Sequence, residues 1–250
     1  MPARASEAGR CAGGAVALLR PIDAARRSAA QLAALGYETV LAPVTQIVAT
    51  GAQPPDGGLD AMLVTSARAF AFLSNENCAR LATTPLFAVG EGSIAAASAR
   101  DLRGAATVAP DGAALTPLIL SRLPRGARLL YLAARDRKND LEHALAAAGV
   151  AVDVVEIYRA EARPAWSEQE ISALRACGAA LHYSRRNAVL ALRLAALAGC
   201  ADAFRALIHV CLSRDVADVL RADGAGAIAL AGQPTEAALF AALRAAAPAA

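Results

Sequence analysis

The chain repeats itself, and this repeat constrains its fold more than any other feature of the sequence. Residues 20–43 align without a gap on residues 133–156, and the alignment continues through three later pairs of segments as the offset grows from 113 to 124 residues. The later pairs are AMLVTSARAF (61–70) with AALHYSRRNA (179–188), LFAVGEGS (86–93) with LIHVCLSR (207–214), and AALTPLIL (113–120) with AALFAALR (237–244). Loop insertions produce such a drift, so we predict a duplicated unit of roughly 110 residues.

Within each copy, short apolar runs alternate with alanine-rich stretches of helical character. The runs predicted to be strands are AVALL (15–19), TVLAP (39–43), AMLVT (61–65), LFAVG (86–90), ATVAP (106–110), RLLYLA (128–133), VDVVEIY (152–158), AALHYS (179–184), LIHVCL (207–212) and AIALA (227–231). Gly36 and Gly149 follow predicted helices at matched positions, where a left-handed cap is expected. The alternation predicts an α/β protein with parallel sheets flanked by helices.

Length and composition exclude several classes of protein. The 250 residues suffice for two ordinary domains. Alanine raises the hydrophobic share to 56%, but no apolar run of about 18 residues is free of charged or turn residues, so we expect no membrane span. The stretch Met1–Gly14 lacks an apolar core, which favours a loose tail over a signal peptide and a cytoplasmic location. A net charge of +3 without a basic block argues against nucleic-acid partners.

The cysteines and histidines give no sign of a metal site. The five cysteines show no Cys-x-x-Cys spacing, and their odd number does not fit a disulfide framework. The three histidines, His143, His182 and His209, are scattered along the chain, so we interpret each as structural. We therefore expect neither a disulfide framework nor a bound metal.

Short polar segments follow the predicted strands, at the edge where open α/β sheets bind ligands. These segments combine hydroxyl groups, arginines and helix starts: they are Thr65-Ser66-Ala67-Arg68, Gly90-Glu91-Gly92-Ser93, Ala134-Arg135-Asp136-Arg137-Lys138, Tyr183-Ser184-Arg185-Arg186 and Cys211-Leu212-Ser213-Arg214. Backbone N–H groups at helix starts, with hydroxyls and arginines, make anion sites. Alternatively, Ser66, Ser184 and Ser213 are ordinary helix N-caps and the arginines are solvated surface charges.

Across residues 16–243, the order and spacing of these segments resemble the uroporphyrinogen-III synthase family. The resemblance is carried by LLRPIDAARRSAAQLAALGYETVLAPVTQI, LVTSARA, FAVGEGS, RLLYLAARDRKNDLEHALAAAGVAVDVVEIYRAE, LHYSRRNA and HVCLSRDVADVLRADG. It implies two flavodoxin-like domains joined by a two-stranded antiparallel connector, with a cleft between them. The implied parts are a first domain of residues 14–42 plus 164–247, a second of 55–155, connectors of 43–54 and 156–163, and a tail of 1–13.

The resemblance also implies a reaction. Members of this family are lyases, specifically hydro-lyases, of porphyrin and heme biosynthesis. Their substrate is hydroxymethylbilane, a linear tetrapyrrole with eight carboxylates, which they dehydrate and close with inversion of ring D through a spiro intermediate. The family uses no cofactor and no metal. A small-molecule polycarboxylate would thus be the partner, with transient contact with the enzyme that makes hydroxymethylbilane, and a monomer is expected because one chain contains both halves of the site.

Roles for individual residues follow from the same resemblance. Tyr158 in EIYRAE matches the family's cleft tyrosine, as a general acid that helps hydroxide leave; alternatively it covers the joint between the domains. The residues implied in binding the carboxylates are Arg20, Ser66, Arg68, Gly90, Ser93, Arg135, Ser184, Arg185, Ser213 and Arg214. Ala134 and Cys211 stand where glycine is common in the family, which leaves the individual side-chain assignments open.

Two other functions compete with this one. The run Gly90-x-Gly92-x-x-Ala95, with Asp111 about 20 residues on, fits the dinucleotide fingerprint and predicts an NAD- or FAD-dependent oxidoreductase. A non-catalytic two-domain protein that binds a ligand would also explain a hinged pair of similar halves.

Overall fold

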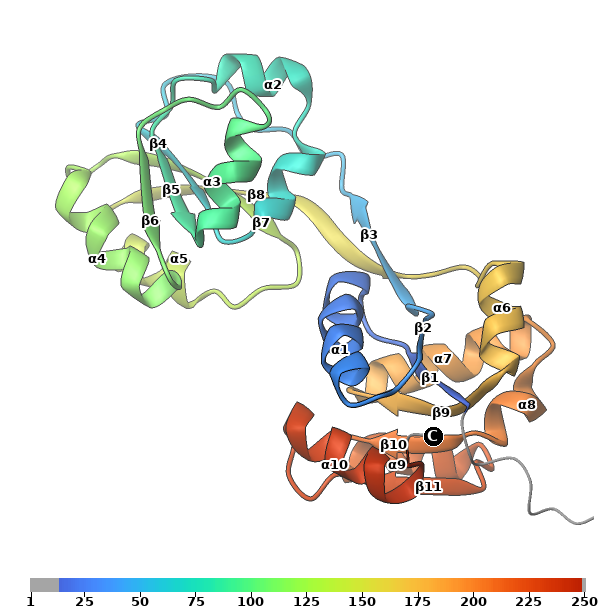
Figure 1. Ribbon diagram of the computed structural model, residues 1–250. Helices are drawn as coiled ribbons and strands as arrows, with labels where there is room; N and C mark the ends of the chain where they lie inside the picture. The colour runs from blue at the N-terminus through green and yellow to red at the C-terminus, as the bar shows by residue number, and fades with distance from the viewer. Residues whose placement is uncertain (1–13, 249–250) are drawn as a thin grey trace, which may run out of the picture. The chain divides into compact units, whose positions relative to one another are not determined.

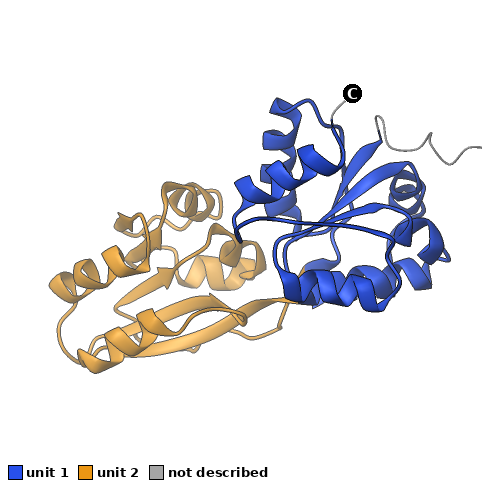
Figure 2. Cartoon of the chain, turned by 90° about the horizontal axis from the view of Figure 1, so that it is seen from below, with its two compact units in different colours: residues 1–46, 161–250 blue, residues 47–160 orange. Residues whose placement is uncertain are grey.

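The computed structural model describes residues 14–248 and divides them into two compact units. Unit 1 combines the described residues up to Gln46 with those from Glu161 onward, and unit 2 comprises Ile47–Ala160 (Figure 2). The predicted tail, residues 1–13, lies outside the described residues. Each buried hydrophobic cluster among residues 14–248 draws its members from a single unit, so each unit has its own core.

Unit 1 contains a five-stranded parallel sheet in the order β11-β10-β9-β1-β2 (Figure 1). Its strands are β1 (Ala15–Leu18), β2 (Thr39–Leu41), β9 (Cys177–His182), β10 (Ile208–Cys211) and β11 (Ala227–Leu230). Its helices are α1 (Ile22–Ala34), α6 (Glu168–Arg175), α7 (Arg185–Leu197), α8 (Ala201–Arg205), α9 (Arg214–Ala222) and α10 (Glu236–Ala246). Along the chain this strand order reads 2-1-3-4-5, which is the flavodoxin-like order.

Unit 2 contains a six-stranded sheet in the order β3-β8-β7-β4-β5-β6. Its strands are β3 (Thr45–Ala49), β4 (Ala61–Val64), β5 (Leu86–Val89), β6 (Ala106–Ala109), β7 (Arg128–Ala134) and β8 (Ala151–Ala162). Its helices are the 3₁₀ helix η1 (Ala67–Phe72), α2 (Asn75–Arg80), α3 (Glu91–Ser98), α4 (Gly112–Arg122) and α5 (Asp140–Ala147). The five parallel strands of this sheet can be renumbered 1 to 5 in the sequence β7, β8, β4, β5 and β6. Their order across the sheet is then again 2-1-3-4-5.

The strand order therefore repeats as the sequence does. β7-α5-β8 corresponds to β1-α1-β2, and β4, β5 and β6 correspond to β9, β10 and β11. All ten predicted apolar runs form strands, and Leu32 and its counterpart Leu145 are both fully buried. Gly36 and Gly149 end α1 and α5 with φ angles of 85° and 83°, as left-handed caps require.

The faces of each sheet are covered by different helices because alternate strand residues point to opposite sides. In unit 2, the cluster around Met62 and Leu130 packs against η1, α2 and α3, whereas the cluster around Leu63 and Leu129 packs against α4 and α5. In unit 1, α1 and α10 cover the face that corresponds to the α4–α5 face. The unit 2 cavity described below lies on this α4–α5 face.

β3 and β8 are neighbours in the sheet, and both cross the boundary between the units. Thr50 N–H donates to the Ile157 carbonyl at 3.1 Å, and Arg163 N–H donates to the Val44 carbonyl at 3.0 Å. Residue numbers rise on one segment as they fall on the other, which is the pattern of antiparallel neighbours. The predicted run VDVVEIY is part of one 12-residue strand that continues to Ala162.

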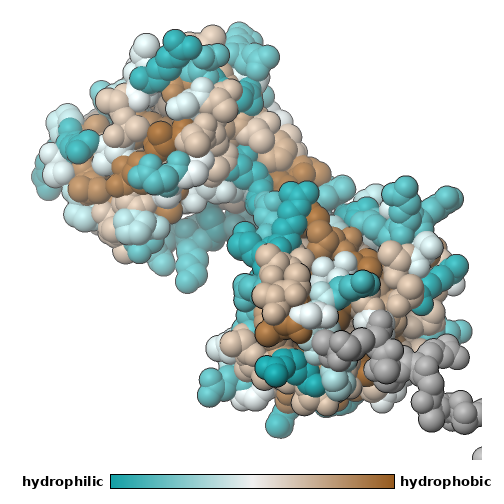
Figure 3. Space-filling view, viewed as in Figure 1, coloured by the Kyte–Doolittle hydropathy of each residue, from teal (hydrophilic) through white to brown (hydrophobic). Residues whose placement is uncertain are grey.

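Hydrophilic residues are interspersed with apolar ones on the face drawn in Figure 3. Among residues 14–248, no helix combines the length and the apolar character that crossing a bilayer requires.

Candidate functional site

The carboxyl edge of each sheet contains a point where the strand order reverses, which is where sheets of this kind bind ligands. In unit 1 this point lies between β1 and β9, and in unit 2 it lies between β7 and β4. Three of the polar segments singled out in the sequence follow strands at these points, namely β4, β7 and β9.

In unit 1 the reversal point is occupied by the protein's own carboxylate. Glu236, the first residue of α10, accepts three hydrogen bonds on Oε1: from Arg20 at 2.6 Å, from Ser28 at 2.6 Å and from Tyr183 at 2.9 Å. The Arg20 guanidinium also lies 3.9 Å from the centroid of the Tyr183 ring. We call this arrangement the Glu236 site.

The Glu236 site is partly shielded from water. Ser28 is fully buried, and the side chains of Arg20 and Glu236 are 23% and 31% exposed. Burial raises the pKa of Tyr183 to about 12, and the nearby Glu236 charge adds to this. Arg20, which the sequence suggested as a ligand for substrate carboxylates, thus already binds an internal one.

The other predicted residues of unit 1 lie at helix starts. Ser184 caps α7, and its Oγ accepts the Asn187 N–H at 3.2 Å. Ser213 has the N-cap position of α9, but its hydroxyl donates to Asp215 and caps no backbone N–H. Arg185 and Arg214 are the first residues of α7 and α9.

In unit 2, the predicted residues Arg68 and Tyr158 lie together. Ser66 caps η1 by accepting the Arg68 N–H at 3.4 Å, and the Arg68 guanidinium lies 5.9 Å from the centroid of the Tyr158 ring. Tyr158 is 6% exposed and stacks on Phe72 with a centroid distance of 5.6 Å. The carbonyl of Tyr158 accepts the Arg135 N–H at 2.9 Å, which brings a third predicted residue to the same place.

A set of ion pairs fixes the loop that follows β7. Arg137 Nη1 donates to Glu156 at 2.9 Å and to the Ala134 carbonyl at 2.9 Å, and the same guanidinium is paired with Glu142. Arg135 Nε donates to the second oxygen of Glu156 at 3.1 Å. The hydrogen bond from Arg137 lowers the pKa of Glu156, so this carboxylate stays charged. Arg135 and Arg137 are therefore both bound to internal carboxylates.

The segment after β5 does not have the geometry of a dinucleotide site. Gly90 caps α3 with a φ of 73°, and the hydroxyl of Ser93 is buried and donates to the Val89 carbonyl at 2.7 Å. β5 lies between β4 and β6, away from the point where the strand order reverses. Asp111 is used as the N-cap of α4, accepting the Ala114 N–H at 2.8 Å. The glycine pattern is therefore explained by a helix start.

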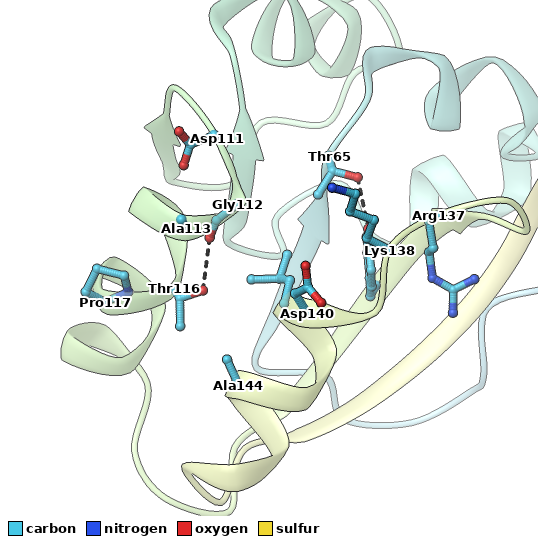
Figure 4. A pocket seen from close by; sticks show the side chains of 12 residues that line it. Thr65, Asp111, Gly112, Ala113, Thr116, Pro117, Arg137, Lys138, Asp140 and Ala144 are labelled. Carbon is cyan, nitrogen blue, oxygen red and sulfur yellow. Dashed lines mark hydrogen bonds between the residues drawn. The ribbon is translucent and has the colours of Figure 1, made fainter. Parts of the chain in front are cut away.

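A cavity of about 780 Å³ lies between α4 and α5, at the carboxyl edge of the unit 2 sheet (Figure 4). Its lining comes from the ends of β4 and β7 and the starts of both helices: Thr65, Asp111, Gly112, Ala113, Thr116, Pro117, Tyr131, Arg137, Lys138, Asp140, Leu141 and Ala144. The hydroxyls of Thr65 and Tyr131 are 2.9 Å apart, and Figure 4 shows the Lys138 side chain extending toward Thr65. We call it the unit 2 pocket.

His182 and His209 form a buried pair in the core of unit 1, as the structural interpretation of these residues expected. His209 Nε2 is 3.0 Å from the Phe204 carbonyl, so it carries the proton, and His182 Nε2 must then donate to His209 Nδ1 at 2.9 Å. Burial lowers the pKa of both rings, that of His209 to about 4. No cluster of three or more metal-ligating side chains occurs within residues 14–248.

Sequence reasoning assigned no role to Ser28, Glu236 or Gly112, and it included Tyr183 only as a member of a polar segment. Ser28, Tyr183 and Glu236 come from three separate parts of the chain, so no local motif marks their contact. A signal was nevertheless present in the repeat, because the alignment of AALTPLIL with AALFAALR places Glu236 opposite Gly112. The two copies thus differ at an equivalent helix start, where one has an acidic residue and the other has glycine.

Comparison with known proteins gives the family. The model of the family described as "Uroporphyrinogen-III synthase HemD" matches residues 26–241. The uroporphyrinogen-III synthetase structure from Helicobacter pylori is 17% identical, with a TM-score of 0.50 over 91% of this chain and 97% of that one. A mutant uroporphyrinogen III synthase from Thermus thermophilus is 19% identical, with a TM-score of 0.43 over 93% of this chain and 98% of that one. No curated protein sequence matched the chain.

The two kinds of comparison support different statements. At such low identity the structural likeness concerns the fold alone, and it agrees with the parallel α/β architecture of both units. The family match is independent of it and spans most of the sequence, including the segments that follow the strands. On that match, this chain belongs to the uroporphyrinogen-III synthase family.

Proposed function

We propose that this protein catalyses the uroporphyrinogen-III synthase reaction in tetrapyrrole biosynthesis, as a lyase that dehydrates and cyclises hydroxymethylbilane with inversion of ring D. The family match over residues 26–241 carries this proposal. The reaction begins when the hydroxyl of the hydroxymethyl group leaves as water, so that its carbon becomes the electrophilic methylene of an azafulvene on the first ring. Ring D then attacks through its substituted carbon, and a spiro intermediate rearranges to the type III product.

The main task of the protein in this reaction is to position the substrate. Without an enzyme the azafulvene reacts at the free carbon of ring D and gives the symmetrical isomer. Holding the substituted carbon at attack distance changes that outcome. Correct orientation can lower the reaction barrier by about 7–11 kcal/mol in favourable cases. The eight carboxylates of the substrate provide the handles. Ser66, Ser184 and the backbone N–H groups at the starts of η1 and α7 are suited to hold them.

Tyr158 is the candidate general acid. A phenol is protonated at neutral pH and can donate its proton to the departing hydroxide. Arg68 over the ring face and Phe72 stacked against it fix the orientation of the ring. Arg68 also places a positive charge beside the acid, where it would attract a substrate carboxylate. Of the predicted arginines, Arg20 and Arg135 bind Glu236 and Glu156. Arg68, Arg185 and Arg214 complete the proposed set of arginines that bind substrate carboxylates.

A product-isomer assay tests the function directly. The full chain is supplied with hydroxymethylbilane made in situ by its upstream synthase, and the oxidised products are separated chromatographically. We expect a large excess of the type III isomer over an enzyme-free control. Equal isomer ratios with and without the protein would reject the activity and favour a non-catalytic ligand-binding protein, and that alternative would still predict binding of the octacarboxylate product.

Because the substrate is reactive, its direct transfer from the enzyme that makes it would be an advantage. Because hydroxymethylbilane closes spontaneously to the wrong isomer, we include in the proposal a cytoplasmic location and transient contact with the enzyme that produces it. We also propose a monomer, since one chain carries both units. Sedimentation of the protein alone, and with the upstream enzyme during turnover, measures both properties.

A further inference from the structure

The two copies of the repeat differ at one matched position in a way that changes what their surfaces can bind. α10 follows β11, α4 follows the corresponding strand β6, and both helices contain eleven residues. Their caps match, because Thr235 accepts the Ala238 N–H and Asp111 accepts the Ala114 N–H. Their buried faces match as well. Leu239 and Leu243 align with Leu115 and Ile119 in the sequence repeat, and all four side chains are fully buried. The first helical residue is Glu236 in one copy and Gly112 in the other.

The other groups around Glu236 also have counterparts in unit 2. Ser28 on α1 aligns with Leu141 on α5, and Tyr183 after β9 aligns with Thr65 after β4. Arg20 itself aligns with Ala133 inside β7, and the cation in unit 2 comes instead from Lys138, in the loop that follows β7. Gly112, Leu141, Thr65 and Lys138 all line the unit 2 pocket. The pocket therefore lies where unit 1 has its Glu236 site.

What unit 2 lacks is a carboxylate at the position that Glu236 has in unit 1, and there is room for one. A Cβ added at Gly112 would meet only the Leu141 Cδ2, at the ordinary contact distance of 3.7 Å. The cavity of about 780 Å³ falls within the range of about 300–1,000 Å³ that small-molecule sites occupy. Instead of an acid at that position, the site has an open space bounded by helix starts, three hydroxyls, charged side chains and apolar side chains.

Lys138 is the cation available to a ligand in that space. Arg137 lines the pocket too, but its guanidinium is paired with Glu142 and Glu156, and in Figure 4 it points away from the other lining residues. Within the described part of the chain, Lys138 makes no hydrogen bond or ion pair that would hold it elsewhere. Of the two acidic residues in the lining, Asp111 is used as a helix cap, while Asp140 offers an acceptor. A ligand that has a ring N–H and a carboxylate arm would donate the N–H to Asp140 and pair the carboxylate with Lys138.

We propose that the unit 2 pocket binds one pyrrole ring of the substrate by a carboxylate arm, which takes the place that Glu236 occupies in unit 1 and pairs with Lys138. This inference rests on the proposed function for the identity of the ligand. Apolar contacts from Pro117 and Ala144 would cover the ring, and the start of α4 would add backbone N–H groups to the carboxylate. The Glu236 site of unit 1 shows the arrangement of carboxylate and cation that the bound ligand would reproduce in unit 2.

The chain itself provides a probe for this site, because Lys138 is its only lysine. Reductive methylation with ¹³C-formaldehyde labels this one side chain, apart from the terminal amine, and preserves its charge. Titration of the labelled full chain with a monopyrrole that carries one acetate and one propionate arm should shift the Lys138 methyl signal. The neutral dimethyl ester of the same monopyrrole is the control and should leave the signal in place. Equal shifts with both compounds, or none with either, would overturn the proposal.

Substitution at Gly112 tests the correspondence with Glu236. Gly112→Glu should fill the site with an internal carboxylate, shift the Lys138 signal without ligand and abolish the response to the monopyrrole. Gly112→Gln has the same size without the charge, so it should block the ligand but leave the Lys138 signal near its original position. Identical signals in the two variants would show that no carboxylate at this helix start reaches Lys138, and the proposal would fall.

Kinetics connect the pocket with turnover. Lys138→Met should raise the KM for hydroxymethylbilane by about tenfold with kcat nearly unchanged, since a charged hydrogen bond to the substrate is lost. Lys138→Arg should restore most of the affinity, and Arg125→Met, which removes an exposed charge before β7 at the other edge of the sheet, should behave as wild type. An unchanged KM in Lys138→Met would reject the pocket while leaving the activity standing. If the wild type formed no excess of type III isomer, the proposed function would fail, and the monopyrrole titration would still decide whether the pocket binds a carboxylate.

Discussion

At the scale of single residues, the hydroxyl of Tyr158 separates acid chemistry from positioning. Tyr158→Phe keeps the ring that stacks on Phe72 and faces Arg68, and removes only the proton donor. We expect kcat to fall by about 100-fold, the lower range of general acid catalysis, with the share of type III isomer largely unchanged. Quenched-flow turnover followed by isomer separation measures both quantities.

The control for this substitution is Tyr37→Phe in unit 1. The Tyr37 hydroxyl donates to the Ala247 carbonyl at 2.9 Å, so its loss removes one hydrogen bond without altering the candidate site. The control should keep its kcat. A Tyr158→Phe enzyme that turned over at the normal rate would exclude Tyr158 as the acid, and one that lost isomer control would make the tyrosine a positioning group.

The buried histidines predict how stability depends on pH. Burial lowers the folded-state pKa of His209 to about 4, against an ordinary value near 6.5 in the unfolded chain, and also lowers that of His182. Between these values the unfolded state binds more protons, so the free energy of unfolding is largest above about pH 6.5 and falls as the pH drops toward 4. The contribution of His209 to this loss is roughly 3 kcal/mol.

Urea denaturation between pH 7.5 and 4.5 measures this slope. His143→Gln is the matched control, because His143 is exposed on α5 and its removal should leave the slope unchanged. His209→Gln should lower stability at pH 7.5 and flatten the pH dependence. A wild-type protein equally stable at both ends of the range would contradict the assignment of a neutral buried pair.

At the scale of secondary-structure elements, the repeat also aligns Gly104 with Gly224, at an offset of 120 residues, and this glycine pair does not share one conformation. Gly36 and Gly149 are equivalent left-handed caps, whereas Gly224 has a φ of 88° and its aligned partner Gly104 does not have a positive φ. Gly104 instead lies against the backbone ahead of β5, where an added Cβ would collide with the carbonyl oxygen of Thr84. Gly104→Ala should therefore lower the free energy of unfolding by about 2–3 kcal/mol.

Gly232→Ala is the control for that substitution, because no atom lies within 4 Å of a Cβ built there and its φ is ordinary. Chemical denaturation of the two variants should show a loss only for Gly104→Ala. Equal stability of both would mean that the segment before β6 moves aside at little cost.

The strands could be predicted from the sequence because their burial leaves a local signal. Every buried parallel strand is a short apolar run, and the repeat reinforces each assignment. Helix starts were less predictable: α1 begins at Ile22, but the aligned helix α5 begins only at Asp140. The difference arises because Arg137 bonds to the Ala134 carbonyl, Glu142 and Glu156, which keeps the intervening residues in a loop and leaves Lys138 at the pocket.

The candidate site was only partly predictable, for a related reason. Ser66 and Ser184 are at helix starts, as the hydroxyl pattern indicated, because capping is a local interaction. The partners of Arg20 and Arg135 are Glu236 and Glu156, which are distant in sequence, and no local pattern marks such pairs. Which arginines are free to bind a ligand is therefore decided by tertiary structure.

At the scale of the whole molecule, the pairing of β3 with β8 predicts that unit 1 can be isolated. Arg163 N–H bonds to the Val44 carbonyl, so Gln46 and Glu161 are opposite each other on neighbouring strands. Replacing Ile47–Ala160 by an Asn-Gly turn should close them as a hairpin and leave the unit 1 clusters complete. The shortened chain should unfold cooperatively, as measured by circular dichroism and by dispersed amide NMR signals.

A register control makes this test specific. The same turn joined to Ala162 instead of Glu161 shifts the pairing by one residue and turns the strand's side chains to the wrong faces. That chain should be less stable than the correctly joined one. If both were unfolded, unit 1 would depend on unit 2 for its stability.

The matching strand orders have a consequence for how the molecule is connected. Each sequence repeat encodes five parallel strands, yet β1 and β2 of the first repeat join β9, β10 and β11 of the second, while β4, β5 and β6 join β7 and β8. The chain is thus a domain swap performed within one polypeptide, with β3 and β8 as its hinge segments. A single repeat expressed alone would hold all the strands of one unit, and two such copies exchanging halves would rebuild both units.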